Sequence, residues 1–72
     1  MKLNPNAVII ARVNAKLTPE QLSQKTGVSL PTIRKIENGE GRTQTRTLLL
    51  IAKSLGVAPG SLILRRSEYD NR

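Results

Sequence analysis

Cysteine and histidine are both missing from this 72-residue sequence, and aromatic residues are almost missing too. Without cysteine and histidine the chain can form no disulfide, cannot build the usual zinc sites, and has neither a histidine base nor a cysteine nucleophile. A single tyrosine, with no phenylalanine or tryptophan, leaves no aromatic platforms on which the bases of single strands or RNA could stack. We therefore expect no metal, no cofactor and no enzymatic activity.

Long hydrophobic runs and acidic residues are scarce as well. No apolar stretch approaches the roughly 20 residues of a membrane span, and the N-terminus lacks a signal-peptide apolar segment, so we expect a cytoplasmic protein with no membrane partner. A chain this short forms one domain at most and leaves little room for an enclosed active site. Its 12 lysines and arginines against 5 acids give a net charge of +7, which favours a polyanionic partner over solubility alone.

Helical signals run along the chain, and no segment sustains the alternation of apolar and polar residues that is typical of a strand. Capping residues, prolines and glycines divide it into five short helices, expected at about 5–16, 19–26, 30–38, 45–55 and 59–64. In the fourth, the apolar spacing predicts an inward face made of Leu48, Ile51, Ala52 and Leu55. The predicted fold is therefore all-α: one compact five-helix domain over residues 1–64, followed by a polar C-terminal tail at 65–72.

The second of these helices has the clearest start. Thr18 caps it, Pro19 takes the first helical position, and Gln21, three residues after the cap, completes a capping box. Gly27 ends the helix, because glycine tolerates the left-handed conformation common at helix C-termini. Only residues 27–29 separate it from the next helix. A turn this short fits a helix-turn-helix, and it equally fits an ordinary corner between two helices of an all-helical domain.

The segment LTPEQLSQKTGVSLPTIRKIENGE resembles the helix-turn-helix of the phage repressor and Cro family, also called the Xre family. The shared features are an EQL-like stretch after a capping residue, a GVS turn, an isoleucine and a closing ENG. The similarity continues through LLLIAKSLGVAPGSLI, which resembles the family's fourth and fifth helices, and covers about residues 5–64. It implies a repressor-like, sequence-specific regulator of transcription that binds double-stranded DNA.

The resemblance also implies a role for individual positions, with the helix at about 30–38 lying in the DNA major groove as the recognition helix. The family's base-reading positions fall on Ser29, Leu30, Pro31, Arg34 and Lys35. Its backbone-gripping positions fall on Thr18, Asn38, Arg42, Thr43 and Arg46. Arg12 and Glu37 match a partly buried arginine–glutamate bridge that would fix the orientation of the recognition helix. The alternatives are a solvated face for Arg34 and Lys35, and two exposed charges for Arg12 and Glu37.

Departures from the family pattern leave further alternatives open. Leu30 and Pro31 replace the usual polar readers and offer only apolar contact, for example with a thymine methyl group. Thr43 stands where a proline is common. Positions that are often polar in the family are apolar here: Ile9, Ile10, Val13 and Leu50. These apolar residues fit either a larger core, filled by the C-terminal tail, or an interface with another chain.

Two functions of different classes are consistent with the sequence. The first is a DNA-binding regulator that acts as a homodimer on a two-fold operator, since family dimers usually pair around the fifth helix, here 57–64. Operator half-sites would then lie about one helical turn apart. The second is a protein-interaction module, such as an antitoxin or a partner-binding regulator, that uses the apolar surface of the first helix.

Overall fold

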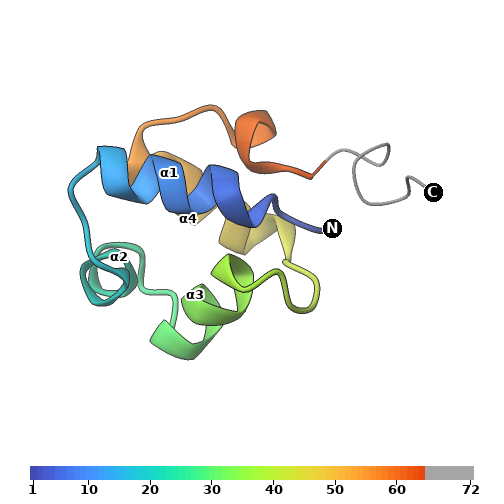
Figure 1. Ribbon diagram of the computed structural model, residues 1–72, viewed down its shortest axis with the longest axis horizontal. Helices are drawn as coiled ribbons and strands as arrows, with labels where there is room; N and C mark the ends of the chain where they lie inside the picture. The colour runs from blue at the N-terminus through green and yellow to red at the C-terminus, as the bar shows by residue number, and fades with distance from the viewer. Residues whose placement is uncertain (65–72) are drawn as a thin grey trace.

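A computed structural model describes residues 1–64, and these form four α-helices and one turn of 3-10 helix. The elements are α1 (Pro5–Asn14), α2 (Pro19–Thr26), α3 (Leu30–Glu37), α4 (Thr45–Leu55) and η1 (Pro59–Leu62). α1 crosses in front of α4, whereas α2 and α3 lie together along the lower side of the molecule (Figure 1). The predicted all-helical class is confirmed; the predicted tail at 65–72 lies outside the described residues.

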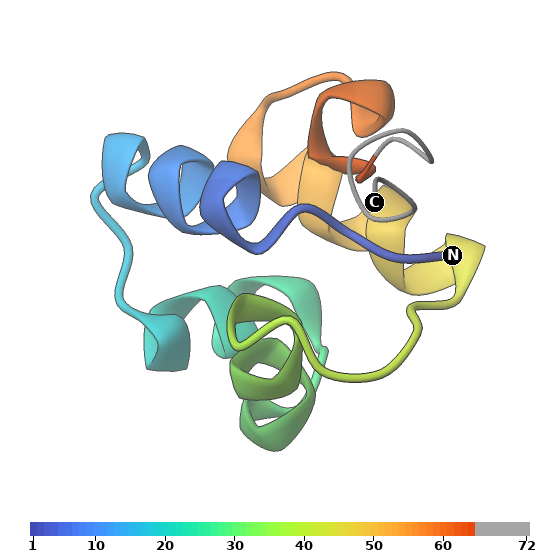
Figure 2. The ribbon, with the colours of Figure 1, turned by 45° about the vertical axis from the view of Figure 1, so that its right-hand side comes forward.

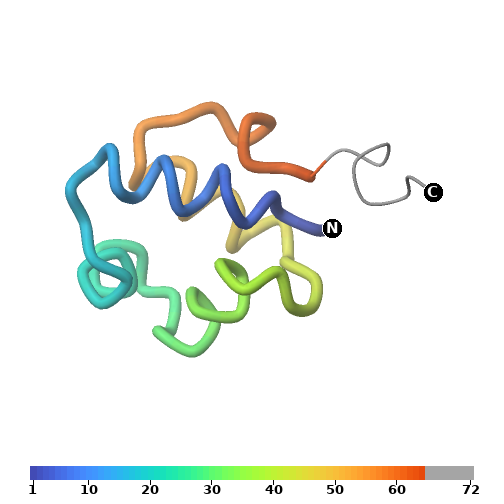
Figure 3. Tube along the Cα trace, viewed as in Figure 1, coloured from blue at the N-terminus to red at the C-terminus, as the bar shows by residue number. Residues whose placement is uncertain are grey.

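The predicted fifth helix is wrong, because the chain after Pro59 makes only the four residues of η1. Ile63 is already extended, with φ −84° and ψ 131°, and pairs with Leu3 in an isolated antiparallel bridge. The N–H of Leu64 donates to the carbonyl of Lys2 at 3.0 Å. Backbone groups that a longer helix would use are thus bonded to the N-terminal segment, which runs beside them in Figure 3.

The predicted end of the first helix is also corrected, from about Lys16 to Asn14. Lys16 adopts φ 61°, in the left-handed region that the helical backbone cannot accommodate. Its N–H donates to the carbonyl of Val13 at 2.9 Å, and the next N–H, from Leu17, donates to that of Arg12. The chain therefore turns away from α1 two residues earlier than its composition indicates.

Each element contributes at least one fully buried side chain to a single apolar core, and the largest of these are Val8, Leu22, Ile33, Ile51 and Leu62. Burial of a side chain of this size stabilises the fold by about 1.5–3 kcal/mol. The predicted inward face of α4 is confirmed, since all of its members are buried: Leu48, Ile51, Ala52 and Leu55. Within residues 1–64 no helix combines the length and apolarity that crossing a bilayer requires.

The predicted capping box at the start of α2 is present. The Thr18 hydroxyl oxygen accepts from the N–H of Gln21 at 3.1 Å, and the Gln21 side-chain oxygen accepts from the N–H of Thr18 at 2.9 Å. Gly27 ends α2 with φ 78°, and its N–H donates to the carbonyl of Ser23 at 2.9 Å. These local bonds set both ends of α2, and with them the direction in which the chain enters the turn.

Side-chain hydrogen bonds then close the turn between α2 and α3. The Thr26 hydroxyl donates to the carbonyl of Leu22 at 2.8 Å and accepts from the N–H of Val28 at 3.0 Å. The Ser23 hydroxyl donates to the carbonyl of Val28 at 2.6 Å. Thr26 is the only polar residue buried with the core of the described chain, and these bonds satisfy it. The angle between the two helices is therefore held by packing and by hydrogen bonds.

Candidate nucleic-acid interface

α3 presents one side to solvent along its whole length. It lies at the lower margin of the molecule in Figures 1 and 2, next to α2 and away from η1. Ile33 and Ile36 bury its inner side. Its outer side consists of exposed residues at Pro31, Thr32, Arg34, Lys35 and the C-cap Asn38. A helix whose inner side is packed in the core and whose outer side is exposed can enter a DNA groove without disturbing the core.

The predicted base-reading positions differ in how available they are. Pro31 lies in the first turn of α3 and is exposed, so its ring costs no intrahelical hydrogen bond. Leu30 is half-buried and offers only part of its side chain. Lys35 is exposed and forms no ion pair with residues 1–64. Lys35 is therefore an accessible cationic donor on the outer side of α3.

Thr32 belongs to this exposed side and was not among the predicted readers. The Ser29 hydroxyl caps α3 by accepting from the N–H of Thr32 at 3.4 Å, and it donates to the Thr32 hydroxyl oxygen at 2.8 Å. Thr32 retains its own hydroxyl hydrogen for another acceptor. The sequence did carry a signal for it, because a polar residue three positions before Lys35 shares that residue's side of the helix.

Arg34 is held by a partner that the resemblance did not predict. Its Nη2 donates to Oε2 of Glu20 at 3.0 Å, which joins α3 to the first turn of α2. The two side chains are 55% and 56% exposed, so the pair stabilises the fold by less than about 1 kcal/mol. The Arg34 guanidinium therefore lies on the α2 side of α3, with a carboxylate beside it.

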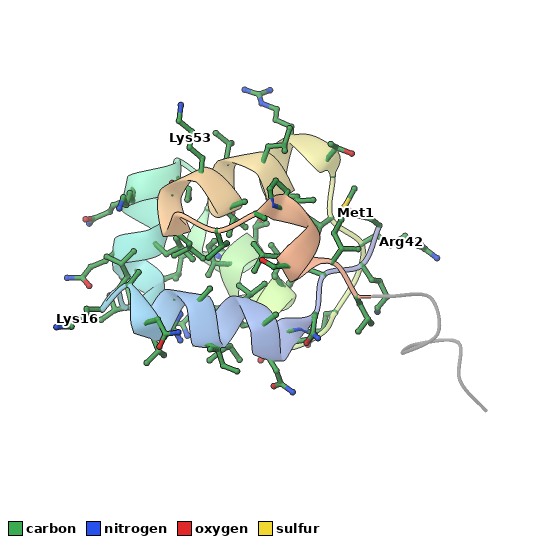
Figure 4. All side chains as sticks on the ribbon, turned by 90° about the horizontal axis from the view of Figure 1, so that it is seen from above. Met1, Lys16, Arg42 and Lys53 are labelled. Carbon is green, nitrogen blue, oxygen red and sulfur yellow. The ribbon has the colours of Figure 1, made fainter. Side chains whose placement is uncertain are left out.

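The predicted backbone-gripping residues do not form one cluster. Lys35 of α3 and two of the predicted residues, Arg42 and Thr43, border a hollow of about 400 Å³ between α3 and the loop before α4. Arg42 projects from this loop into solvent (Figure 4). The Thr43 backbone holds the N-terminus, donating to the carbonyl of Met1 at 2.7 Å. Arg46 is exposed on α4 outside the hollow, and the Thr18 hydroxyl is engaged as the α2 cap.

Arg12 of α1 and Glu37 of α3 form a bidentate ion pair. Nε donates to Oε2 at 2.7 Å and Nη2 to Oε1 at 3.3 Å, while Nη1 donates to the carbonyl of Leu17 at 2.7 Å. The Arg12 and Glu37 side chains are only 13% and 11% exposed. One guanidinium thus ties the C-terminal end of α3 and the loop after α1 to α1 itself.

The described chain has the order of helices and the short α2–α3 turn of a helix-turn-helix, and a family model described as helix-turn-helix matches residues 8–62. The chain belongs to this family. The resemblance to phage repressor and Cro proteins is thereby confirmed, and a DNA-binding regulator is the general function that membership supports. No curated protein and no solved structure matches the chain.

This helix-turn-helix domain also carries an apolar groove on the side of α1 that faces η1. The groove has a volume of about 470 Å³, and its lining includes Ile10, Ala11, Leu55, Val57 and Leu62. Among the four unusual apolar positions, Ile10 and Val13 are 59% and 56% exposed, Leu50 is also exposed and Ile9 is half-buried. Within residues 1–64, therefore, Ile10 and Val13 add little to the core.

Proposed function

We propose that this helix-turn-helix protein is a sequence-specific, repressor-like regulator of transcription that binds double-stranded DNA with α3 in the major groove. The observation that carries the proposal is the outer side of α3, which is exposed and carries two cations, Arg34 and Lys35. The one acid of α3, Glu37, is turned inward to Arg12. The B-DNA major groove admits an α-helix, and the net charge of +7 favours approach to a polyanion.

In this arrangement Lys35 and Arg34 donate to guanine O6 and N7, while Leu30 and Pro31 supply apolar contact and Ser29 a hydroxyl. The phosphate contacts fall to Thr18, Asn38, Arg42, Thr43 and Arg46. Support comes from the hollow that Lys35, Arg42 and Thr43 share at one end of α3. The Arg12–Glu37 pair would hold α3 at a fixed angle to the rest of the domain.

Selection from a random duplex library, followed by anisotropy titration of the selected and scrambled duplexes at several salt concentrations, tests this function. We expect the selected duplex to bind at least about 10³-fold more tightly and both affinities to fall steeply with salt. Lys35→Ala should weaken binding of the selected duplex by about 1–3 kcal/mol. Lys53→Ala is the matched control, because this exposed lysine projects from the outer side of α4 (Figure 4). Equal affinity for all duplexes would refute sequence-specific recognition.

The groove beside Ile10 and Val57 favours binding of another protein chain. We propose that the protein pairs there as a homodimer on a two-fold operator, through residues 57–64 and the neighbouring side of α1. The other occupant would be a protein partner, as for an antitoxin or partner-binding regulator. An exposed apolar groove of this kind favours association, because covering it removes apolar surface from water.

Sedimentation equilibrium of the protein and of Ile10→Ser, with and without operator duplex, tests the homodimer. Ile10 is 59% exposed, so its replacement should leave the fold intact and weaken only association. We expect two copies on a full operator for the natural chain and a higher dimer dissociation constant for the variant. One copy per full operator at all concentrations would refute the homodimer and favour the partner-binding alternative.

A further inference from the structure

An acidic residue of α2 holds the single arginine of α3. Glu20 Oε2 accepts from Nη2 of Arg34 at 3.0 Å, and both side chains are more than half exposed. The guanidinium has five N–H donors in all, and the other four bond no acceptor within residues 1–64. The arginine can therefore keep its carboxylate partner and still donate two parallel hydrogen bonds to another molecule.

We propose that Glu20 is a specificity-determining residue, which positions Arg34 for base contact and suppresses its binding to DNA phosphates. The proposal rests on the proposed function of α3. A free guanidinium binds a phosphate of any sequence, whereas one paired with a carboxylate carries little net charge toward the backbone. Guanine O6 and N7 are uncharged acceptors, so the pair can still meet them bidentately. Glu20 thus lowers the affinity for random DNA more than the affinity for a duplex that places a guanine opposite Arg34.

The position of Glu20 in α2 strengthens this effect. It lies in the first turn, where the positive end of the helix dipole attracts phosphate. The carboxylate weakens that attraction beside the phosphate contact proposed for Thr18. Leu30 and Pro31 donate no side-chain hydrogen bond, so most hydrogen-bond donation from α3 to the bases is left to its two cations, Arg34 and Lys35. Control over one of them therefore changes a large share of the readout.

A double-mutant cycle of Glu20→Gln and Arg34→Ala tests the inference, with anisotropy titrations of selected and random duplexes over a salt series. We expect Glu20→Gln to bind random duplex about two- to fivefold more tightly and the selected duplex with a smaller gain. The ratio of the two affinities should fall, and the log–log salt slope on random duplex should steepen by about 0.9. In the Arg34→Ala background, Glu20→Gln should change both quantities much less, because only the effect of the carboxylate on the N-terminus of α2 remains.

Circular dichroism of the four proteins checks that all are folded, which the high exposure of both side chains favours. An equal effect of Glu20→Gln in both backgrounds would mean that only the overall charge matters, and would overturn the inference. An unchanged affinity ratio would overturn it as well. Failure of the proposed function has a different signature, since the natural chain would then bind no duplex preferentially at any salt concentration.

Discussion

Replacement of Glu37 by alanine should remove a large part of the stability of this domain. The change leaves the Arg12 guanidinium, only 13% exposed, with the carbonyl of Leu17 as its remaining partner. Loss of one member of a buried ion pair typically costs about 3–5 kcal/mol, because the other charge stays desolvated without compensation. A chain of this length has a total stability of about 4–11 kcal/mol. Glu37→Ala should therefore lower the urea midpoint sharply.

Removal of both charges should cost less than removal of the glutamate alone. In the double variant Arg12→Met, Glu37→Leu no charge is buried, and apolar side chains of similar volume fill the space. The carbonyl of Leu17 loses its donor, for which we expect a cost of about 1–3 kcal/mol. The double variant should thus be more stable than Glu37→Ala.

Urea unfolding followed by far-ultraviolet circular dichroism measures these differences, with the exposed Arg34–Glu20 pair as an internal control. Glu20→Ala removes the same type of partner from a pair that is 55% and 56% exposed, so it should cost less than about 1 kcal/mol. An equal loss for Glu37→Ala and Glu20→Ala would refute the reasoning, because it would show that burial of the Arg12–Glu37 pair has no energetic consequence.

Three further substitutions probe the local backbone. Lys16→Gly should raise the melting temperature in calorimetry by a few degrees. Glycine removes the strain of a left-handed backbone at φ 61°, about 1–2 kcal/mol, and this exceeds its own entropic cost of about 0.5–1 kcal/mol. A lower melting temperature would contradict this. Thr18→Ala should destabilise the domain by about 1 kcal/mol in urea unfolding through loss of the α2 cap, whereas Thr45→Ala, at an exposed position just after an N-cap without a side-chain bond, should cost less. Gly27→Ala should cost about 1–2 kcal/mol in the same assay, from φ 78° alone because a methyl group there meets no atom within 4 Å; an unchanged midpoint would mean that the turn relaxes.

The features that the sequence predicted well are those decided within a few residues. The Thr18–Gln21 capping box, the stop at Gly27 and the start of α3 after Ser29 all depend on hydrogen bonds or dihedral angles of adjacent residues. The apolar spacing of α4 predicted its buried face for the same reason, because helical periodicity places those residues on one side. A family resemblance then extended this local reading to the general function.

Apart from the end of α1 and the exposed Thr32, which are local features, the errors and omissions concern contacts between distant parts of the chain. The N-terminal segment pairs with the backbone of Ile63 and Leu64, and this pairing prevents a fifth helix that the local sequence alone favours. The exposure of Ile10 depends on what packs beside α1, and the Glu20–Arg34 pair depends on the angle at which α3 leaves the turn. No window of neighbouring residues contains that information.

The sequence by itself thus determined the helical class, most helix boundaries and the family, because caps, breakers and apolar periodicity act over a few residues. Only the tertiary structure decided which charges are buried together, as for Arg12 and Glu37, and which meet in solvent, as for Glu20 and Arg34. The energy of an ion pair depends on distance and on exposure to water, and both follow from the packing of helices that are remote in the chain.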